Sequence, residues 1–326
     1  MQHGTPIPRI KPPALQPGDT VGIVAPASNI QRDLLDAGCD MLRSLEYRPF
    51  CLDSIFDHDL YFAGSAERRA RELEEMFVRD EVRAVLCARG GYGSNYLLDK
   101  LNLEKIARNP KIFVGYSDNT TLLTHFVDSA GLITFHGPMA TKDFAHTDGV
   151  DLNSWQAALT GLSKWEVPSD SGIKPLVEGA AEGVLYGGCL SMLVASLGTP
   201  YEIRTAGTIL FLEDVATKPF QIDRMLMQLK LAGKLESVGG IIFGEMIDCV
   251  QQKNDQGYTL EEVVLRVVGH LGIPVAFGLR SGHVSHRNVT LPIGVRAALS
   301  VSSGQARLTI LEAATVPAAI PPRRRT

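Results

Sequence analysis

The sequence predicts an α/β protein of two domains, an N-terminal domain with a mostly parallel sheet flanked by helices and a strand-rich C-terminal α/β domain. Two observations indicate this fold. In the first half of the chain, short apolar runs of strand length alternate with amphipathic helical stretches, an order typical of a parallel sheet with helices on both faces. The chain also has 326 residues, which is long for one hydrophobic core and comfortable for two.

The spacing of apolar residues places the elements of the first half. Three apolar runs are expected to be buried strands: TVGIVAPAS (20–28), VRAVLCA (82–88) and KIFVGY (111–116). Between the first two, residues 34–45 place leucines on one side of a helix, and residues 66–77 carry one apolar stripe on an otherwise charged segment. This spacing predicts surface helices with one buried face.

The second half is less regular. Helical spacing predicts three helices, at 190–197, 220–231 and 260–270. Further apolar runs are expected to be strands, some of them antiparallel: GTILFLEDV (207–215), GGIIFGEM (239–246), IPVAFGL (273–279), NVTLPIGVRAALSV (288–301) and ARLTIL (306–311).

One segment interrupts the periodicity. Residues 167–183 are rich in Gly, Pro, Ser and charged residues, which predicts a linker. It would separate an N-terminal domain, 1–166, from a C-terminal domain, 184–312. Residues 313–326 contain several prolines and end in arginines, and we expect a disordered tail there.

Bulk composition excludes several classes of function. The formal net charge of −4 provides no attraction for nucleic acid or an anionic membrane. No apolar stretch approaches the roughly 18 residues of a membrane span, and the proline-rich N-terminus lacks the apolar core of a signal peptide. The five cysteines are scattered without close pairs, as expected of reduced thiols. We therefore expect a cytoplasmic protein without nucleic-acid or membrane partners.

The sequence Gly-Tyr-Ser-Asp at 115–118 follows a predicted strand and begins a helix-like run. A serine at such a turn points its hydroxyl off the carboxyl end of a sheet, as nucleophilic serines do, and Gly115 permits a tight turn. Serine and aspartate are also preferred helix N-caps. From this stretch alone Ser117 is either a nucleophile or a cap, and the cap is the commoner case.

A glycine-rich turn, ARGGYGSN at 88–95, follows another predicted strand. Gly90, Gly91 and Gly93 expose backbone N–H groups that suit an anion or an oxyanion, although a flexible turn is the simpler interpretation. The spacing matches neither the G-x-G-x-x-G dinucleotide motif nor a phosphate-binding loop that ends in G-K-[ST]. The turn is therefore a weak indication of nucleotide binding.

Acidic and imidazole side chains occur in the second half. Glu213 and Asp214 close a predicted strand, and His283 and His286 lie in a loop before another. Each alone is more often a cap, a salt bridge or an incidental loop residue. Together with Ser117 they supply the nucleophile, base and carboxylate that acyl transfer needs. A metal site is less favoured, because only two loop residues separate the histidines and no H-E-x-x-H motif occurs.

Several motifs occur in a specific order: GDTVGIVAPAS, RGGYGS, VGYSDNTTLL, YGGCLSMLVASLGTPY, ILFLEDV, PFQIDRML and SGHVSHRNVTLPIG. With these motifs the chain resembles the LD-carboxypeptidase family of serine peptidases, from about Pro12 to about Leu311. This family includes the muramoyltetrapeptide carboxypeptidases and the microcin C self-immunity hydrolases.

The resemblance implies a two-domain α/β fold whose active site lies where the domains meet. It places Ser117 as nucleophile, Glu213 as carboxylate and His283 as base, with the backbone amides of Gly91 and Asp118 as the oxyanion hole. It also implies no metal or organic cofactor, a homodimer in the cytosol, and a small peptide substrate. The best-known members release the terminal D-alanine of murein tetrapeptides in cell-wall recycling.

The resemblance leaves the roles of some residues undecided. A carboxypeptidase must bind a free carboxylate, for which Arg89 or a backbone nest at Gly90 and Tyr92 is the candidate. Cys189 stands where the family commonly has asparagine, and a loop about one residue longer than usual leaves His286 as an alternative base.

Three other functions remain alternatives. They are a microcin C-type peptidyl-nucleotide hydrolase with the same triad, an α/β-hydrolase esterase, and a non-catalytic protein that binds a small anion. The esterase shares the chain order serine, acid, histidine. It is disfavoured by Asn119, where the G-x-S-x-G motif requires glycine.

Overall fold

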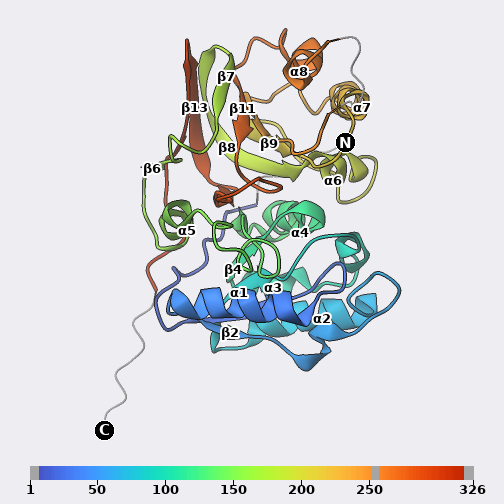
Figure 1. Ribbon diagram of the computed structural model, residues 1–326, viewed down its shortest axis with the longest axis vertical. Helices are drawn as coiled ribbons and strands as arrows, with labels where there is room; N and C mark the ends of the chain where they lie inside the picture. The colour runs from blue at the N-terminus through green and yellow to red at the C-terminus, as the bar shows by residue number, and fades with distance from the viewer. Residues whose placement is uncertain (1–6, 251–256, 319–326) are drawn as a thin grey trace.

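The computed structural model describes residues 7–250 and 257–318 and confirms the predicted α/β architecture. Within these residues the strands form two sheets, which lie one above the other in Figure 1. Helix α4 (Thr120–His125) lies between the sheets and contacts strands of both. The space between the sheets is therefore where the two halves of the chain meet.

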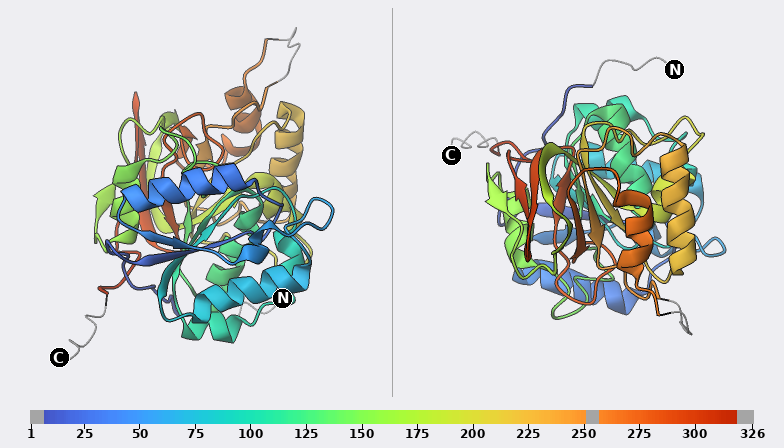
Figure 2. Two further views of the ribbon diagram at one scale, coloured as in Figure 1. Left: turned by 60° about the horizontal axis from the view of Figure 1, so that its bottom comes forward. Right: turned by 90° about the horizontal axis from the view of Figure 1, so that it is seen from above.

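The first sheet has the strand order β12-β5-β4-β3-β1-β2. Its strands are β1 (Thr20–Val24), β2 (Arg48–Phe50), β3 (Val82–Cys87), β4 (Ile112–Gly115), β5 (Thr134–His136) and β12 (Leu291–Ile293). All neighbours are parallel except β12, which pairs antiparallel with β5. Helix α1 (Arg32–Ser44) covers one face and α2 (Ala66–Val78) the other (Figure 2), and α3 (Leu103–Arg108) packs beside α2.

The second sheet has the strand order β6-β14-β13-β8-β9-β10-β11-β7. Its strands are β6 (Trp165–Glu166), β7 (Lys174–Val177), β8 (Gly179–Cys189), β9 (Thr208–Glu213), β10 (Gly240–Gly244), β11 (Val275–Leu279), β13 (Arg296–Ser302) and β14 (Gln305–Ile310). The central strands from β8 to β11 are parallel, and antiparallel strands lie on both sides of them. The other α-helices among the described residues are α5 (Leu152–Leu159), α6 (Leu190–Ala195), α7 (Pro219–Leu231) and α8 (Leu260–Val268).

Side-chain caps determine where several helices begin. Ser65 accepts the N–H of the third residue of α2, and Asn102 does the same for α3. Thr259 and Glu262 form a reciprocal capping box at the start of α8. Each cap satisfies backbone donors that the first helical turn leaves free.

The segment 167–183, for which the sequence predicts a linker, contains regular secondary structure. It contains β7 and the first residues of β8, and β7 is an edge strand antiparallel to β11. Pro175 lies within β7, which an edge strand tolerates because it lacks a partner on one side. The glycines and prolines of this segment interrupt the alternation of apolar and polar residues that predicts a strand, but the backbone still pairs with the neighbouring strand.

Residues 291–293 also lie elsewhere than expected. They fall within the predicted C-terminal domain, 184–312, but form β12 and complete the first sheet, where Leu291 lies opposite His136. The apolar run at 288–301 is thus divided between two sheets, β12 in the first and β13 in the second. The sequence pattern shows that these residues are extended but not which sheet edge they join.

The predicted disordered tail starts too early. Ala314 and Thr315 are buried, and Val316 pairs with Pro13 in a short parallel bridge. These residues therefore pack on the N-terminal segment. Residues 319–326 of the predicted tail lie outside the described residues.

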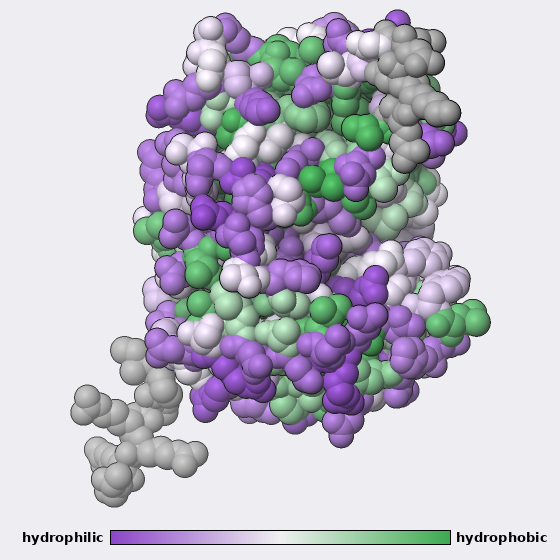
Figure 3. Space-filling model, viewed as in Figure 1, coloured by the Kyte–Doolittle hydropathy of each residue, from purple (hydrophilic) through white to green (hydrophobic). Residues whose placement is uncertain are grey.

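The surface agrees with the composition. On the face shown in Figure 3, hydrophilic residues predominate and apolar residues are scattered in small groups. Among the residues that the structure describes, none of the helices combines the length and the apolar character needed to cross a bilayer.

Candidate active site

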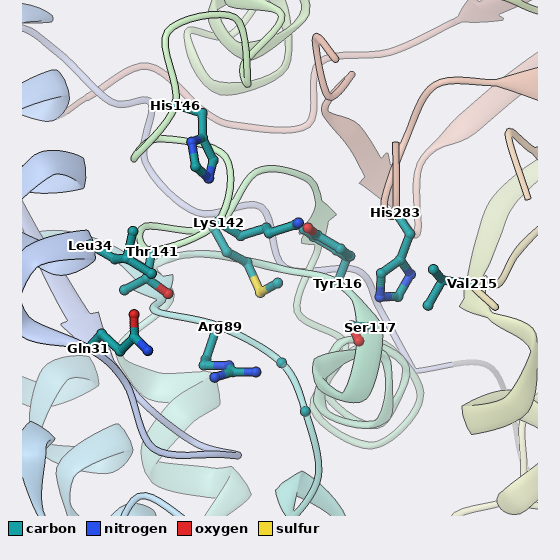
Figure 4. A pocket seen from close by; sticks show the side chains of 13 residues that line it. Gln31, Leu34, Arg89, Tyr116, Ser117, Thr141, Lys142, His146, Val215 and His283 are labelled. Carbon is teal, nitrogen blue, oxygen red and sulfur yellow. The ribbon is translucent and has the colours of Figure 1, made fainter. Parts of the chain in front are cut away.

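A cavity of about 560 Å³ lies between the two sheets. Its lining follows the ends of strands from both of them, with Arg89 and Gly90 after β3, Ser117 after β4, and Val215 and His283 after β9 and β11. Ligand sites of open α/β sheets lie at this carboxyl edge of the strands. Ser117 and His283 lie at the same end of the cavity in Figure 4.

Ser117 occupies a sharp turn directly after β4. It is the first residue of a 3₁₀ turn, Ser117–Asn119, and its φ is +62°. A left-handed conformation costs a non-glycine residue about 1–3 kcal/mol and persists where the surroundings impose it, often at functional sites. In the described structure neither this turn nor α4 begins with a side-chain cap, so capping does not account for Ser117.

The backbone of Gly90 passes directly beside Ser117. A Cβ added at Gly90 would lie 2.8 Å from Ser117 Oγ and 3.4 Å from the amide nitrogen of Asp118. The next residue, Gly91, has a φ of +110°, and a Cβ there would collide with Ser28 Oγ. Glycines are therefore required at both positions, and the two turns enclose the serine hydroxyl together.

Hydrogen bonds connect the glycine-rich turn to the serine turn. The Asp118 carboxylate accepts the Ser94 N–H at 2.7 Å, and Asn119 Oδ1 accepts the Ser94 hydroxyl at 3.2 Å. The Asn119 amide donates to the Arg89 carbonyl at 3.2 Å. Burial raises the pKa of Asp118, although the bonds from Ser94 and the charge of Arg69 oppose this. The residues that follow Ser117 thus anchor the neighbouring turn.

Arg69 on α2 braces the same turn with a buried cation. Its guanidinium donates to the carbonyl oxygens of Gly93 at 2.8 Å and Gly64 at 3.1 Å, and also to that of Pro26. Its side chain is almost fully buried. The sequence shows Arg69 only as one of several charges on a surface helix, and no local pattern distinguishes it. The glycine-rich turn is therefore held in place rather than free.

Glu213 and His283 form a hydrogen-bonded pair at the edge of the second sheet. Glu213 ends β9 with 0% exposure, and its Oε2 accepts His283 Nδ1 at 2.8 Å and the His283 backbone N–H at 3.1 Å. A Cβ added at Gly282, whose φ is +95°, would lie 2.8 Å from Glu213 Oε2. With Nδ1 engaged, the imidazole has Nε2 available for a reacting group.

Opposing effects set the pKa values of this pair. Burial by itself would raise the pKa of Glu213, but interactions with His283 and His136 outweigh it and lower the pKa to about 2. Burial would lower the pKa of His283, but the charge and hydrogen bond of Glu213 raise it above its usual value. Each partner therefore favours the charged form of the other.

The geometry distinguishes His283 from His286. His286 is exposed, and its Nδ1 lies 2.9 Å from the hydroxyl of its neighbour Ser285. Of the two histidines, only His283 lines the described cavity. Among the hydrogen bonds of the described residues there is none between Ser117 Oγ and His283, and such catalytic contacts often tighten only when substrate binds.

Residues of the N-terminal half hold the loop that carries His283. Buried Asp143 accepts the Asn288 side-chain amide at 3.1 Å. Asn288 in turn accepts the Gly282 N–H at 2.9 Å and donates to the Gly282 carbonyl at 3.1 Å. Burial raises the pKa of Asp143 to about 6. The ring of Tyr116 packs edge-on against His283, with ring centroids 5.1 Å apart.

A second buried histidine lies on the other side of Glu213. His136 ends β5, and its Nε2 is 3.8 Å from Glu213 Oε1. Its Nδ1 is 3.0 Å from Ser281 Oγ. The sequence marks His136 only as part of a short apolar stretch, so its position beside the carboxylate was missed.

Cys189 and Asp214 have supporting positions next to Glu213. Cys189 ends β8 beside Glu213, and its backbone N–H donates to Thr120 Oγ1 at 3.0 Å. Burial raises the pKa of its thiol well above the usual value. Asp214 accepts the Ser191 N–H at 2.9 Å, at the start of α6. Cys189 thus contributes a backbone contact between the two halves, and Asp214 anchors a helix.

Tyr92, a predicted substrate contact, lies outside the residues that line the cavity. Its ring belongs to a surface cluster, with centroid distances of 5.9 Å to Phe62 and 6.0 Å to Tyr96. Its backbone N–H donates to Ser28 Oγ at 3.2 Å. Tyr92 therefore supports the glycine-rich turn from outside.

Two cationic side chains project into the cavity. Arg89 and Lys142 both line it and point inward in Figure 4. No ion pair of the described residues includes either side chain, and Arg89 donates to the Asn29 carbonyl at 3.2 Å. The cavity thus offers unpaired positive charge near Ser117. Among the described residues, no three His, Cys, Asp or Glu side chains gather as metal ligands would.

Two family models match the chain: the LD-carboxypeptidase N-terminal domain over residues 21–137 and the LD-carboxypeptidase C-terminal domain over residues 182–299. A probable murein peptide carboxypeptidase of Bacillus subtilis (strain 168) is 40% identical over 294 residues, which cover 90% of this chain and 92% of the relative.

Two solved structures share the fold. A muramoyltetrapeptide carboxypeptidase from Oxalobacter formigenes has a TM-score of 0.80 and 31% identity, over 92% of this chain and 100% of the other. The microcin C7 self-immunity protein MccF, in its wild-type apo state, has a TM-score of 0.85 and 26% identity, over 94% of this chain and 100% of the other.

Proposed function

Because the chain belongs to the LD-carboxypeptidase family, we propose that it is a serine carboxypeptidase that cleaves an L,D peptide bond and releases the terminal D-alanine of murein tetrapeptides. One observation carries the chemistry. His283, whose Nδ1 lies 2.8 Å from Oε2 of the buried Glu213, lines the end of a cavity that Ser117 also lines. This arrangement supports an acyl-transfer site built from Ser117, His283 and Glu213.

Ser117 is the nucleophile of this reaction, and His283 is its general base. With Nδ1 held by Glu213, the imidazole presents Nε2 to the serine hydroxyl and accepts its proton as Oγ attacks the scissile carbonyl. Glu213, whose pKa is about 2, stays ionised and stabilises the imidazolium. His283 then donates the proton to the leaving amine, and water hydrolyses the acyl-enzyme by the reverse transfers.

The oxyanion of the tetrahedral intermediate is assigned to two backbone amides, those of Gly91 and Asp118. Both belong to the turns that enclose Ser117, and the close approach of Gly90 to the Ser117 hydroxyl supports this assignment. Rigid donors aimed at developing charge lower the barrier, and losing one costs about 3–4 kcal/mol. Arg69 and Asn119 keep these turns fixed, so little reorganisation is needed during the reaction.

Arg89 and Lys142 are the proposed site for the free carboxylate of the substrate. A carboxypeptidase must place that carboxylate one residue beyond the scissile bond. The two cations line the cavity with Ser117, and neither belongs to an ion pair of the described residues. Arg89 was a candidate from the sequence, whereas Lys142 was not.

Mass spectrometry of the protein incubated with a murein tetrapeptide tests the proposal. We expect loss of one D-alanine from the tetrapeptide, and no loss with Ser117→Ala. Removal of a catalytic serine lowers kcat by about 10⁶. An intact tetrapeptide after prolonged incubation would contradict the substrate, and retained activity in Ser117→Ala would contradict the nucleophile.

A microcin C-type hydrolase is the second candidate, favoured by the structural similarity to MccF. The same mass spectrometry with a peptidyl-adenylate distinguishes it. The tryptophans of this chain do not favour a nucleobase, because Trp155 and Trp165 are both buried in the core and expose no ring for stacking. We therefore expect cleavage of the tetrapeptide and not of the peptidyl-adenylate.

The esterase and the anion-binding protein are less favoured alternatives. An esterase would hydrolyse p-nitrophenyl acetate rapidly. A non-catalytic protein would bind peptide without reacting with a serine-directed fluorophosphonate. We further propose a homodimer that works in the cytoplasm, as the family resemblance implies, and sedimentation of the purified protein tests the dimer.

A further inference from the structure

Two buried polar atoms that have no hydrogen-bond partner among the described residues face each other beside the His283–Glu213 pair. They are His136 Nε2 and Glu213 Oε1, which lie 3.8 Å apart on side chains with no exposed surface. Leaving a buried acceptor unsatisfied is unfavourable, and more so when the acceptor is charged. The separation exceeds a normal hydrogen bond by less than about 1 Å, a gap that a small rotation of the imidazole would close.

The surroundings of His136 determine which ring nitrogen carries hydrogen. Its Nδ1 lies 3.0 Å from Ser281 Oγ, and a serine hydroxyl is able either to donate or to accept. An unprotonated Nε2 would place two acceptors face to face in a buried site, which is unfavourable. Nε2 therefore carries hydrogen, and Glu213 Oε1 is the acceptor in front of it.

His136 also contacts both ends of the loop that carries His283. Ser281 lies before His283 and contacts the His136 ring. Leu291 lies after it and pairs with the His136 backbone where β12 joins β5. His136 of the first sheet thus contacts the loop of His283 both at its beginning, at Ser281, and at its end, at Leu291.

From this arrangement we propose that His136 is a positioning residue that donates Nε2–H to Glu213 Oε1 and holds the loop of His283 against the first sheet. The inference rests on the proposed function, since it concerns the same site. Glu213 then has a hydrogen-bond donor on each carboxylate oxygen, from a different sheet on each side. This fixes the plane of the carboxylate, and with it the direction in which Nε2 of His283 points.

His136→Phe tests this role. The variant loses both ring nitrogens but keeps an aromatic ring next to Phe211 and Tyr116, whose centroids lie 5.1 and 5.9 Å from that of His136. We expect kcat/KM for the tetrapeptide to fall about 100-fold, because small displacements of reacting groups have effects of this size. Labelling of Ser117 by a fluorophosphonate should slow by a similar factor. In a Glu213→Gln background the same change should add little, because the two residues act as one unit.

The pH profile of kcat/KM separates positioning from a structural defect. The titratable side chains around His283 are those of Glu213, Asp214, Asp143 and Tyr116. Without the His136 nitrogens, the Glu213 carboxylate is no longer held in the plane that favours its hydrogen bond to His283. It then stabilises protonated His283 less, the pKa of His283 falls, and the acidic limb of the profile should move to lower pH. A loss of folded protein would lower the activity at every pH and leave the limb unchanged.

His125→Phe is the matched control. His125 is also buried in the N-terminal half, on α4, and packs edge-on against Tyr201 with centroids 5.1 Å apart. It is outside the cavity lining. We expect this variant to keep wild-type labelling and kcat/KM.

The outcomes are distinguishable. Wild-type labelling and kcat/KM in His136→Phe would overturn the role of His136, as would a loss of activity with an unmoved acidic limb. Absence of both labelling and hydrolysis in the wild-type protein would overturn the proposed function and this role with it. Labelling without hydrolysis of the tetrapeptide would overturn the substrate alone, and the labelling rates would still decide the role of His136.

Discussion

Gly90 lies so close to Ser117 that a methyl group on its Cα would come within 2.7 Å of the Ser117 Cβ. Gly90 belongs to the turn after β3 and Ser117 to the turn after β4. Because β3 and β4 are parallel neighbours, these two turns lie side by side. This contact fixes the glycine-rich turn around the hydroxyl and suggests the first prediction.

Gly90→Ala should lower kcat by about 100-fold or more. The added methyl group must displace the Ser117 side chain or the adjacent amides, and displacements of about 1 Å have effects of this size. Gly239→Ala is the control, because a Cβ there meets its nearest atoms only at 3.5 Å. Steady-state kinetics of both variants, with circular dichroism to verify folding, would make the comparison. Equal activity in the two variants would argue against a tight turn around Ser117.

Glu213→Gln should reduce kcat by about 10⁴, as removal of the orienting carboxylate does in other triads. It should also move the acidic limb of kcat/KM. Protonated His283 cannot act as base, so activity falls as pH drops through the His283 pKa. Glu213 raises that pKa, so the wild-type limb lies above the usual value for histidine and the variant limb lies at lower pH. An unchanged limb would show that Glu213 does not set the state of the base.

His283→Ala and His286→Ala should differ sharply. Loss of His283 removes the proposed base, whose Nδ1 lies 2.8 Å from Glu213 Oε2, and we expect kcat to fall by several orders of magnitude. His286 is exposed and contacts its neighbour Ser285, so its loss should leave kcat within about twofold. Kinetics on the tetrapeptide and labelling by fluorophosphonate both report this difference. The reverse ranking would assign the base to His286.

Lys142→Ala and Arg89→Ala should each raise KM for a tetrapeptide with a free carboxylate by about ten- to a hundredfold. A charge-assisted hydrogen bond contributes about 1.5–3 kcal/mol, which corresponds to this range. The same variants should have little effect on a tetrapeptide amide, which lacks the charge and should itself be a poor substrate. If free acid and amide respond equally to the substitutions, the carboxylate is bound elsewhere.

Asn288→Ala should lower both stability and activity. The change removes the bonds to Gly282 and leaves the buried Asp143 oxygen without its amide donor, which costs about 1–3 kcal/mol. Urea unfolding measures this loss, and kcat should fall because the loop of His283 is no longer held. Asn153→Ala, at an exposed position of α5, should leave both quantities nearly unchanged. Similar unfolding free energies for the two variants would contradict the bracing role.

Much of the fold follows from local pattern. The strands at 20–24, 82–87 and 112–115 and the helices at 190–195, 219–231 and 260–268 lie where apolar spacing predicts them. Local pattern does not predict a strand whose position depends on pairing with a strand distant in the sequence. The segment 167–183 lacks alternation but forms strands, and residues 291–293 join the sheet of the other half.

The candidate site divides in the same way. Ser117 and the glycine-rich turn are recognisable because they follow strands that end at one edge of a parallel sheet, and Glu213 and His283 because their motifs resemble those of a known family. Arg69, Asn288 and His136 left no such sign, since their role depends on which distant residue each one touches.

The sequence by itself determined the strand and helix periodicity, the turns after the strands, and the residue types that acyl transfer requires. Periodicity depends only on near neighbours, so it survives in a single chain. The tertiary structure alone decided that Glu213 meets His283 across 70 residues and His136 meets Ser281 across 145. It also decided the depressed pKa of Glu213, because burial and the approach of distant charges exist only once the two sheets have packed together.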